Sequence, residues 1–241
     1  MDKKDDLLNR ATNPEQYDRQ GISWKTEIGL DSPMRKFFWA RIMKHCPDWQ
    51  GRRVLDVGAG TGWALEEARK LGAAATVGVE PSANNLIFSR QLYPKIQMVR
   101  GPLEHYHGDL KFDRVLSVMS LPHIRNLGEA FEKIRRLLAE PAGEFVAIVP
   151  DYDYYRLQRH GYEVRIQDLN YCEYVTSIKR DLGTLVDIVR KEMAYVLAAD
   201  GCGLQLKTAE PMPPSEELME KLPKYKNYRG NVLTNFFKFT L

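Results

Sequence analysis

From residue 53 onward, short apolar runs alternate with longer segments that carry apolar residues at helical spacing. The apolar runs predict five buried strands, at 54–57, 76–79, 96–99, 113–118 and 145–149. The longer segments predict helices, at 63–71, 82–93 and 126–139. This alternation predicts an α/β fold, in which a mostly parallel sheet carries helices on both faces.

Both ends of the chain depart from this rhythm. The first 30 residues are polar and predict a loose arm or lid, and Ser32 and Pro33 are then suited to cap and begin a helix. Beyond the fifth strand, residues 151–180 hold six of the 12 tyrosines. We expect them to form an aromatic acceptor pocket or a packed cap over the sheet. The segment 181–199 predicts a helix, and 204–208 and 236–241 predict an antiparallel pair of strands.

A glycine loop follows the first strand and is the strongest chemical signal. It reads Asp56-Val57-Gly58-Ala59-Gly60-Thr61-Gly62-Trp63. A dinucleotide loop of the pattern G-x-G-x-x-G requires glycine where Trp63 stands, and a P-loop requires a Gly-Lys-Ser/Thr ending, which is absent. The carboxylate of Asp56 is poorly placed for a pyrophosphate and suits a ligand with an ammonium group.

An acidic residue ends the second strand. Glu80 can accept hydrogen bonds from both hydroxyls of a ribose, and it would repel a 2′-phosphate. Together with the glycine loop, it indicates a nucleoside ligand that has a positive end and no phosphates.

This combination resembles the class I S-adenosylmethionine-dependent methyltransferases, and within them the ubiquinone/menaquinone-biosynthesis and small-molecule branch. The resemblance covers roughly residues 50–210. It implies a seven-stranded Rossmann-like sheet with the last strand antiparallel. It also implies an N-terminal arm and helical lid over 1–50 and a methyltransferase domain over 51–241, with the Tyr-rich insertion at about 151–180. The implied cofactor is S-adenosyl-L-methionine.

The resemblance also assigns residues to the cofactor site. These are Asp56, Gly58, Ala59, Gly60, Gly62, Trp63, Glu80, Pro81, Pro102, Leu103, Glu104, Ser117 and Met119. After the third strand the family often carries Gly-Asp-Ala-Glu, but this chain has Pro102 in place of the aspartate. The Leu103 N–H and Glu104 are then the candidates to contact the adenine.

A proton acceptor is required if the methylated atom bears a proton. His123, in the turn after the fourth strand, is the candidate general base, because an imidazole can accept a proton near neutral pH. A tyrosine is the other candidate, and an activated carbon or sulfur acceptor would need neither.

Composition narrows the partners. The 35 Lys and Arg residues nearly balance the 32 Asp and Glu residues, so the net charge of +3 does not favour a nucleic acid. A basic aromatic stretch at 221–229 could nevertheless touch RNA or form a solvated loop. Three widely spaced Cys residues favour neither a disulfide scaffold nor a metal site. No apolar run approaches the length of a membrane span. We therefore expect a cytoplasmic monomer or homodimer.

The predicted function is methyl transfer to an oxygen, nitrogen or carbon atom of a small molecule. Alternatives are an RNA or tRNA methyltransferase of the same fold and a non-catalytic cofactor-binding subunit. An NAD-dependent dehydrogenase is disfavoured by Trp63 at a glycine position.

Overall fold

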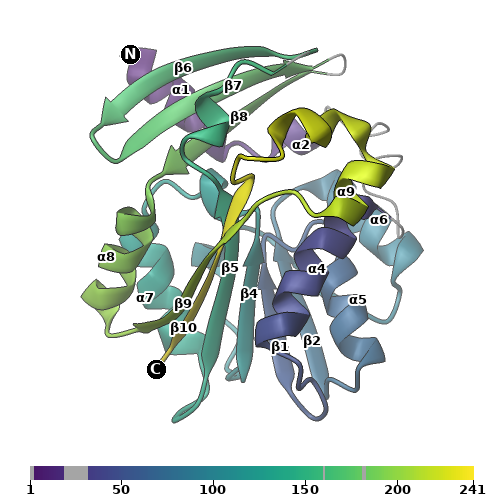
Figure 1. The fold of residues 1–241 in the computed structure, drawn as a ribbon. Helices are drawn as coiled ribbons and strands as arrows, with labels where there is room; N and C mark the ends of the chain where they lie inside the picture. Colours follow the sequence, from purple (N-terminus) through teal and green to yellow (C-terminus); the bar gives the residue numbers. More distant parts are fainter. Residues whose placement is uncertain (1–2, 19–31, 160, 181–182) are drawn as a thin grey trace.

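The core of the molecule is a seven-stranded sheet with strand order β3-β2-β1-β4-β5-β10-β9 (Figure 1). A computed structural model describes residues 3–18, 32–159, 161–180 and 183–241. The strands are β1 (Arg53–Val57), β2 (Ala75–Glu80), β3 (Gln97–Arg100), β4 (Arg114–Val118), β5 (Glu144–Pro150), β9 (Gln205–Met212) and β10 (Thr234–Thr240). β1 to β5 pair in parallel, and β10 runs antiparallel to both of its neighbours. The predicted fold class is confirmed.

Helices cover both faces of this sheet and bury two apolar cores. The larger ones are α4 (Pro33–His45), α5 (Trp63–Lys70), α6 (Ala83–Leu92), α7 (Leu127–Leu137) and α8 (Glu192–Cys202). α7 and α8 contribute to the core that contains Leu55, whereas α4 and α5 contribute to the core that contains Val54. Successive residues of β1 therefore point into opposite cores, as expected for a central parallel strand.

A second sheet has the order β6-β7-β8, and its first two strands lie in the predicted Tyr-rich insertion at about 151–180. β6 (Glu163–Asn170), β7 (Glu173–Arg180) and β8 (Gly183–Arg190) are antiparallel. The predicted helix over 181–199 is confirmed only from Glu192, where α8 begins, and is wrong for 183–190, which form β8. Residues 185–190 are all buried, so the strand lacks the alternation of apolar and polar residues that would have identified it.

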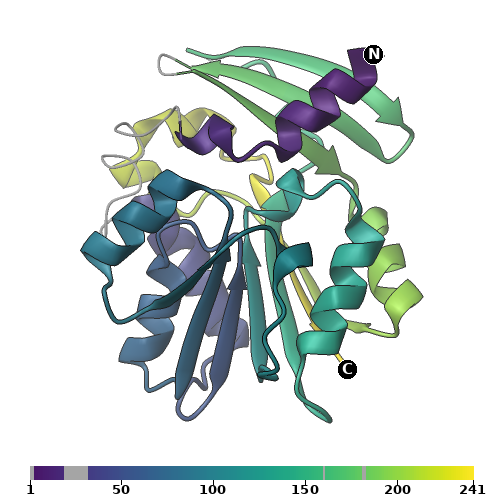
Figure 2. The same cartoon turned by 180° about the vertical axis from the view of Figure 1, so that it is seen from behind.

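Two short helices precede the main domain. α1 (Lys3–Thr12) lies against the small sheet, and α2 (Glu15–Asp18) lies above the main one (Figures 1 and 2). Leu8 and Ala11 of α1 pack against Val175, Val186 and Ile188. Residues 3–18 of the predicted loose arm or lid are mostly helical, and the apolar residues of α1 are docked on the small sheet. The remainder of the predicted arm, residues 19–31, lies outside the described residues.

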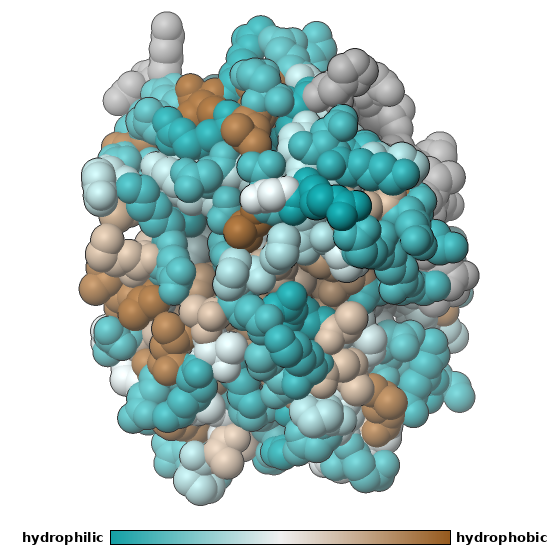
Figure 3. All heavy atoms as spheres, viewed as in Figure 1, coloured by the Kyte–Doolittle hydropathy of each residue, from teal (hydrophilic) through white to brown (hydrophobic). Residues whose placement is uncertain are grey.

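The surface is mostly hydrophilic in the view of Figure 3. Hydrophobic residues gather on the side where Figure 1 places α8, whose Met193 and Leu197 are exposed. None of the helices in the described part of the chain combines the length and the apolar content that crossing a membrane requires.

Candidate active site

A cavity of about 1120 Å³ lies at the carboxyl ends of the parallel strands. Its floor includes Val57 of β1, Glu80 of β2 and Val118 of β4. Tyr17 of α2 and Asp187 of β8 line it as well. Open α/β sheets bind ligands at this edge. The cavity exceeds the roughly 300–1,000 Å³ of common ligand pockets, so it has room for two molecules.

The glycine loop forms one wall of the cavity. Gly58 has φ +67°, and a Cβ at this position would lie 2.4 Å from the Cβ of Ser120. Gly60 has φ +56° and would place a Cβ in open space. Gly58 is therefore required for close packing against the turn after β4, whereas Gly60 leaves the backbone open to the cavity.

Glu80 is hydrogen-bonded to the same loop. Its Oε2 accepts from the Gly60 N–H at 2.7 Å, and its Oε1 accepts from the Ser82 N–H at 2.8 Å. Burial raises the pKa of this carboxyl, and the Ser82 and Gly60 N–H groups partly oppose the rise. The carboxylate oxygens keep further lone pairs for a ligand hydroxyl.

Three predicted site residues lie behind the cavity and do not line it: Asp56, Gly62 and Ser117. Asp56 is buried, and its Oδ1 has no hydrogen-bond partner among the described residues. Burial, with a contribution from Glu80, raises its pKa well above the usual range. Ser117 bonds to Ser120 at 2.5 Å, which bonds in turn to the carbonyl of Val57. Ser117 thus positions the turn after β4.

The other predicted cofactor residues line the cavity. They are Ala59, Trp63, Pro81, Pro102, Leu103, Glu104 and Met119. Leu103 and Glu104 lie on the 3-10 turn η1 (Leu103–His105). Met119 has φ +59°, a left-handed conformation that is uncommon outside glycine and typical of functional sites. The fold brings these residues together from the ends of four strands, β1 to β4.

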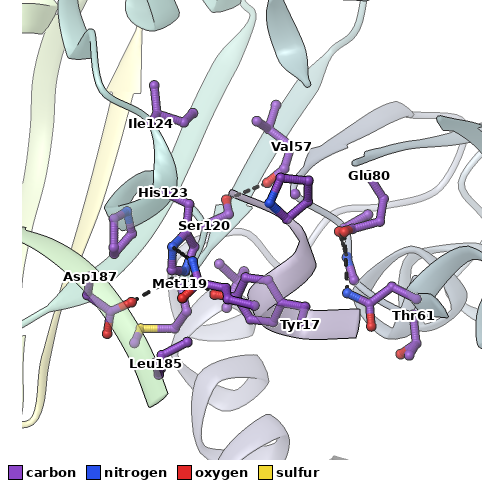
Figure 4. A pocket seen from close by; sticks show the side chains of 18 of the residues that line it. Tyr17, Val57, Thr61, Glu80, Met119, Ser120, His123, Ile124, Leu185 and Asp187 are labelled. Carbon is purple, nitrogen blue, oxygen red and sulfur yellow. Dashed lines mark hydrogen bonds and ion pairs between the residues drawn. The ribbon is translucent and has the colours of Figure 1, made fainter. Parts of the chain in front are cut away.

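His123 contacts three elements that the sequence did not connect with it, α1, α2 and β8 (Figure 4). It ends the turn η2 (Leu121–His123), between Tyr17 and Asp187. Its Nδ1 lies 3.1 Å from the carbonyl oxygen of Ala11, which can only accept, and 3.4 Å from the Gln16 amide nitrogen; on the shorter contact we assign the proton to Nδ1. The Tyr17 hydroxyl then donates to Nε2, and Asp187 Oδ1 lies 3.5 Å from the same nitrogen.

The surroundings of His123 keep it neutral. Burial lowers the pKa of the imidazole, and Asp187 and the Ala11 carbonyl oppose the decrease only in part. A neutral imidazole that accepts a phenol proton is a competent base. Tyr17, His123 and Asp187 all line the cavity, an arrangement that can accept a proton from a bound molecule.

Tyrosines form the opposite wall. Tyr154, Tyr155 and Tyr162 of the insertion line the cavity, and Tyr225 and Tyr228 join them. The other insertion tyrosines are Tyr152, Tyr171 and Tyr174, and they lie outside the cavity wall. The two tyrosines of the basic stretch at 221–229 therefore face the cavity. Both lie in the turn η4 (Pro223–Tyr228), which follows α9 (Glu216–Lys221).

Sequence reasoning missed several cavity residues. Thr61 accepts a hydrogen bond from Arg35 at 3.0 Å, and Arg35 lies over the ring of Trp63. Burial lowers the pKa of Arg35 to about 10. Asp187 was hidden in a segment that predicted a helix. The only indication of Arg159 in the sequence was its position in the Tyr-rich segment.

Comparison with known proteins shows the family of the chain. A family model described as a methyltransferase domain matches residues 31–185, which is more than half of the chain. The chain belongs to the methyltransferase domain family. The predicted class of enzyme agrees with this match.

Relatives of the methyltransferase differ in their acceptors. This chain is 33% identical over 138 residues to a tRNA U34 carboxymethyltransferase of Idiomarina loihiensis, a match that covers 54% of this chain and 41% of the relative. It is 24% identical over 115 residues to a mitochondrial ubiquinone biosynthesis O-methyltransferase of Dictyostelium discoideum, covering 42% and 36%. The chain thus spans about two fifths of the length of these relatives.

Solved structures share the fold of the methyltransferase. An S-adenosylmethionine-dependent methyltransferase from Mesorhizobium loti superposes with a TM-score of 0.70 at 20% identity, covering 88% of this chain and all of the other. The glycopeptide N-methyltransferase MtfA, in complex with S-adenosylmethionine, gives 0.62 at 16% identity, covering 85% and 93%. At these identities the likeness concerns the fold.

Proposed function

We propose that this methyltransferase transfers the methyl group of S-adenosylmethionine to a small molecule held in the cavity beneath α2 and the small sheet. The observation that carries this proposal is the closure of the cavity from above. Residues of α2, β8 and η4 line it together with the glycine loop and Glu80. A space of this kind suits an acceptor small enough to be enclosed.

The residues present fit the cofactor. The Gly60 backbone is open to the cavity, and Glu80 lies there with carboxylate oxygens suited to ribose hydroxyls. Asp56 lies behind the cavity wall, so its buried carboxyl would not contact the bound molecule directly. Leu103, Glu104 and Met119 would hold the remainder of the molecule.

The chemistry divides between cofactor and protein. S-adenosylmethionine, when bound, supplies a methyl group already activated by its sulfonium. The protein therefore has to align the acceptor, exclude water and remove a proton. Tyr17 can take a proton from an acceptor hydroxyl or amine as its own proton passes to Nε2 of His123. Asp187 then faces the imidazolium and stabilises it.

Cofactor binding is the first test. S-adenosylhomocysteine should bind in calorimetry and raise the melting temperature, whereas NAD should do neither. Glu80→Ala should weaken S-adenosylhomocysteine by a factor of about 10 to 100, the usual effect of losing charge-assisted hydrogen bonds. Stabilisation by NAD alone would overturn the proposal.

The proton path has its own test. Tyr17→Phe keeps the ring and removes the hydroxyl, so kcat should fall by about 10²–10⁴-fold with an acceptor that loses a proton. S-adenosylhomocysteine affinity should stay within about threefold, because the hydroxyl contacts His123 and not the glycine loop. Unchanged turnover would remove Tyr17 from the proton path.

A nucleic-acid acceptor is the second candidate. The relatives named as tRNA U34 carboxymethyltransferases favour it. A filter assay with radiolabelled S-adenosylmethionine separates the two. Label in total tRNA would support this candidate, whereas label in a small-molecule extract that passes the filter would support the first.

A further inference from the structure

Two cationic side chains of the tyrosine wall have no carboxylate partner among the described residues. Arg159 and Lys224 both line the cavity, and neither forms an ion pair with any of the residues described. Arg125, which also lines the cavity, is instead paired with Asp5 at 2.9 Å. The positive charge of Arg159 and Lys224 is therefore available to a ligand.

Arg159 is held in place by aromatic rings. Its guanidinium carbon lies 5.3 Å from the ring centroid of Tyr154, 4.9 Å from that of Tyr155 and 6.0 Å from that of Tyr162. Such contacts attract a cation electrostatically and fix the plane of the guanidinium. The guanidinium also has a hydrogen bond with the Tyr154 side chain, and its Nε and Nη2 atoms take no part in hydrogen bonds among the described residues.

Two donors of Arg159 are buried and unsatisfied. Its Nε and Nη2 have no hydrogen-bond partner within the described part of the chain. These atoms are adjacent on one edge of the guanidinium and form the fork that matches the two oxygens of a carboxylate. Buried donors are rarely left unpaired in folded proteins, and these two favour a ligand that satisfies them.

Lys224 adds a second positive charge across the ring of Tyr162. Its Nζ lies 6.0 Å from that ring centroid and 5.5 Å from that of Tyr225, and it donates to the Tyr162 hydroxyl at 3.4 Å. Tyr154, which contacts Arg159, also packs edge-on against Tyr228 at 5.2 Å. The wall therefore offers ring faces for a flat apolar body beside charges for an anion.

We propose that Arg159, supported by Lys224, binds a carboxylate of the acceptor, whose planar body packs among the surrounding tyrosines. This inference rests on the proposed function, because it identifies the substrate class of that same cavity. The acceptor is an aromatic or conjugated acid whose methylated atom lies on the Tyr17 side of the cavity.

A neighbouring arginine provides a matched control. Arg156 also lies over tyrosine rings, at 5.5 Å from Tyr152 and 4.7 Å from Tyr174. Its guanidinium is already paired with Asp168 at 2.7 Å, and it lies outside the cavity wall. Arg156→Gln thus removes a stacked arginine without touching the proposed carboxylate site.

The experiment measures binding of benzoate, benzamide and phenyl phosphate by calorimetry on protein saturated with S-adenosylhomocysteine. Benzoate should bind at least about tenfold more tightly than its neutral isostere benzamide, the usual worth of hydrogen bonds to a charged group. Arg159→Gln should abolish the preference for benzoate over benzamide. Arg159→Lys should retain part of this preference, and Arg156→Gln should leave it unchanged.

Several results would overturn the carboxylate site. These are equal binding of benzoate and benzamide, an unchanged preference in Arg159→Gln, and a loss of preference in Arg156→Gln equal to that in Arg159→Gln. Tighter binding of phenyl phosphate than of benzoate would overturn the choice of a carboxylate. Failure of S-adenosylhomocysteine to bind would instead overturn the proposed function, and a benzoate preference measured without it would still support the anion site.

Discussion

At the scale of single residues, Gly58 and Gly60 offer a direct test of the loop. Gly58→Ala places a Cβ against Ser120 in a left-handed backbone, so it should destabilise the fold by several kcal/mol, about as much as other overpacked sites. Gly60→Ala meets open space, so only about 1 kcal/mol of backbone strain is expected. Because its Cβ enters the cavity wall, S-adenosylhomocysteine affinity should still fall.

Thermal denaturation and calorimetry of the two variants check this contrast. The expected pattern is an unstable Gly58→Ala and a nearly stable, weakly binding Gly60→Ala. Equal melting temperatures would contradict the close approach of Gly58 to Ser120.

His123 makes stability depend on pH. Burial holds its folded-state pKa below the ordinary 6.5, so the unfolded chain takes up the proton first as pH falls. This contribution to stability is fully present above pH 6.5 and is lost as the solution becomes more acidic. His123→Gln should therefore show a smaller drop in melting temperature between about pH 7.5 and 5.5 than the parent protein. His107→Gln, at an exposed position, should show the parent's drop, and equal slopes for all three would refute the assignment.

The sequence predicted some of these residues better than others. Gly58, Gly60 and Glu80 could be placed together at the cavity from sequence because they lie at the carboxyl ends of neighbouring strands. His123 was singled out alone, since its partner Tyr17 is 106 residues away and no local pattern joins them. Arg159 was not singled out, because an unsatisfied donor is a property of three-dimensional packing.

At the scale of elements, β8 shows why a strand can be misread. Val186 and Ile188 pack against α1, whereas Leu185 and Asp187 line the cavity. A strand with both faces covered loses its period-two pattern, and its paired apolar residues then fit a helix equally well. The main sheet was predictable because its strands are separated by clear helices and turn residues.

The docking of α1 on the small sheet is testable. Leu8→Ala should remove about 2–3 kcal/mol of local packing at a buried contact with Val175, Val186 and Ile188. Limited proteolysis should then cut the first 18 residues faster, and the main domain should resist as before. Arg10→Ala, on the exposed side of α1, is the control. Unchanged cleavage of Leu8→Ala would indicate that α1 is held by other contacts.

At the scale of the whole molecule, the chain folds back over its own active site. α2 lies above the main sheet, and its neighbour α1 is held by the insertion between β5 and α8. Such long-range contacts are invisible to sequence periodicity, which reports one element at a time. Sequence reasoning therefore predicted the sheet and the cofactor edge, and left open what covers them.

The attachment of α2 has a consequence for the rate of turnover. Asp18 accepts from the Ser82 hydroxyl at 2.6 Å and from the Asn84 N–H at 3.1 Å, beside Glu80, while the adjacent Tyr17 contacts His123. One short helix thus touches both the cofactor side and the acceptor side of the cavity. We therefore predict that both products leave only after these bonds open, that release limits the steady-state rate and that the first turnover appears as a burst.

Asp18→Ala should shorten the residence time of S-adenosylhomocysteine in stopped-flow measurements and leave its association rate nearly unchanged. The burst should disappear because chemistry becomes the slower step. An unaltered dissociation rate would mean that the exit route does not pass beneath α2. If the prediction holds, the enzyme's speed is set by a helix of four residues that performs none of its chemistry.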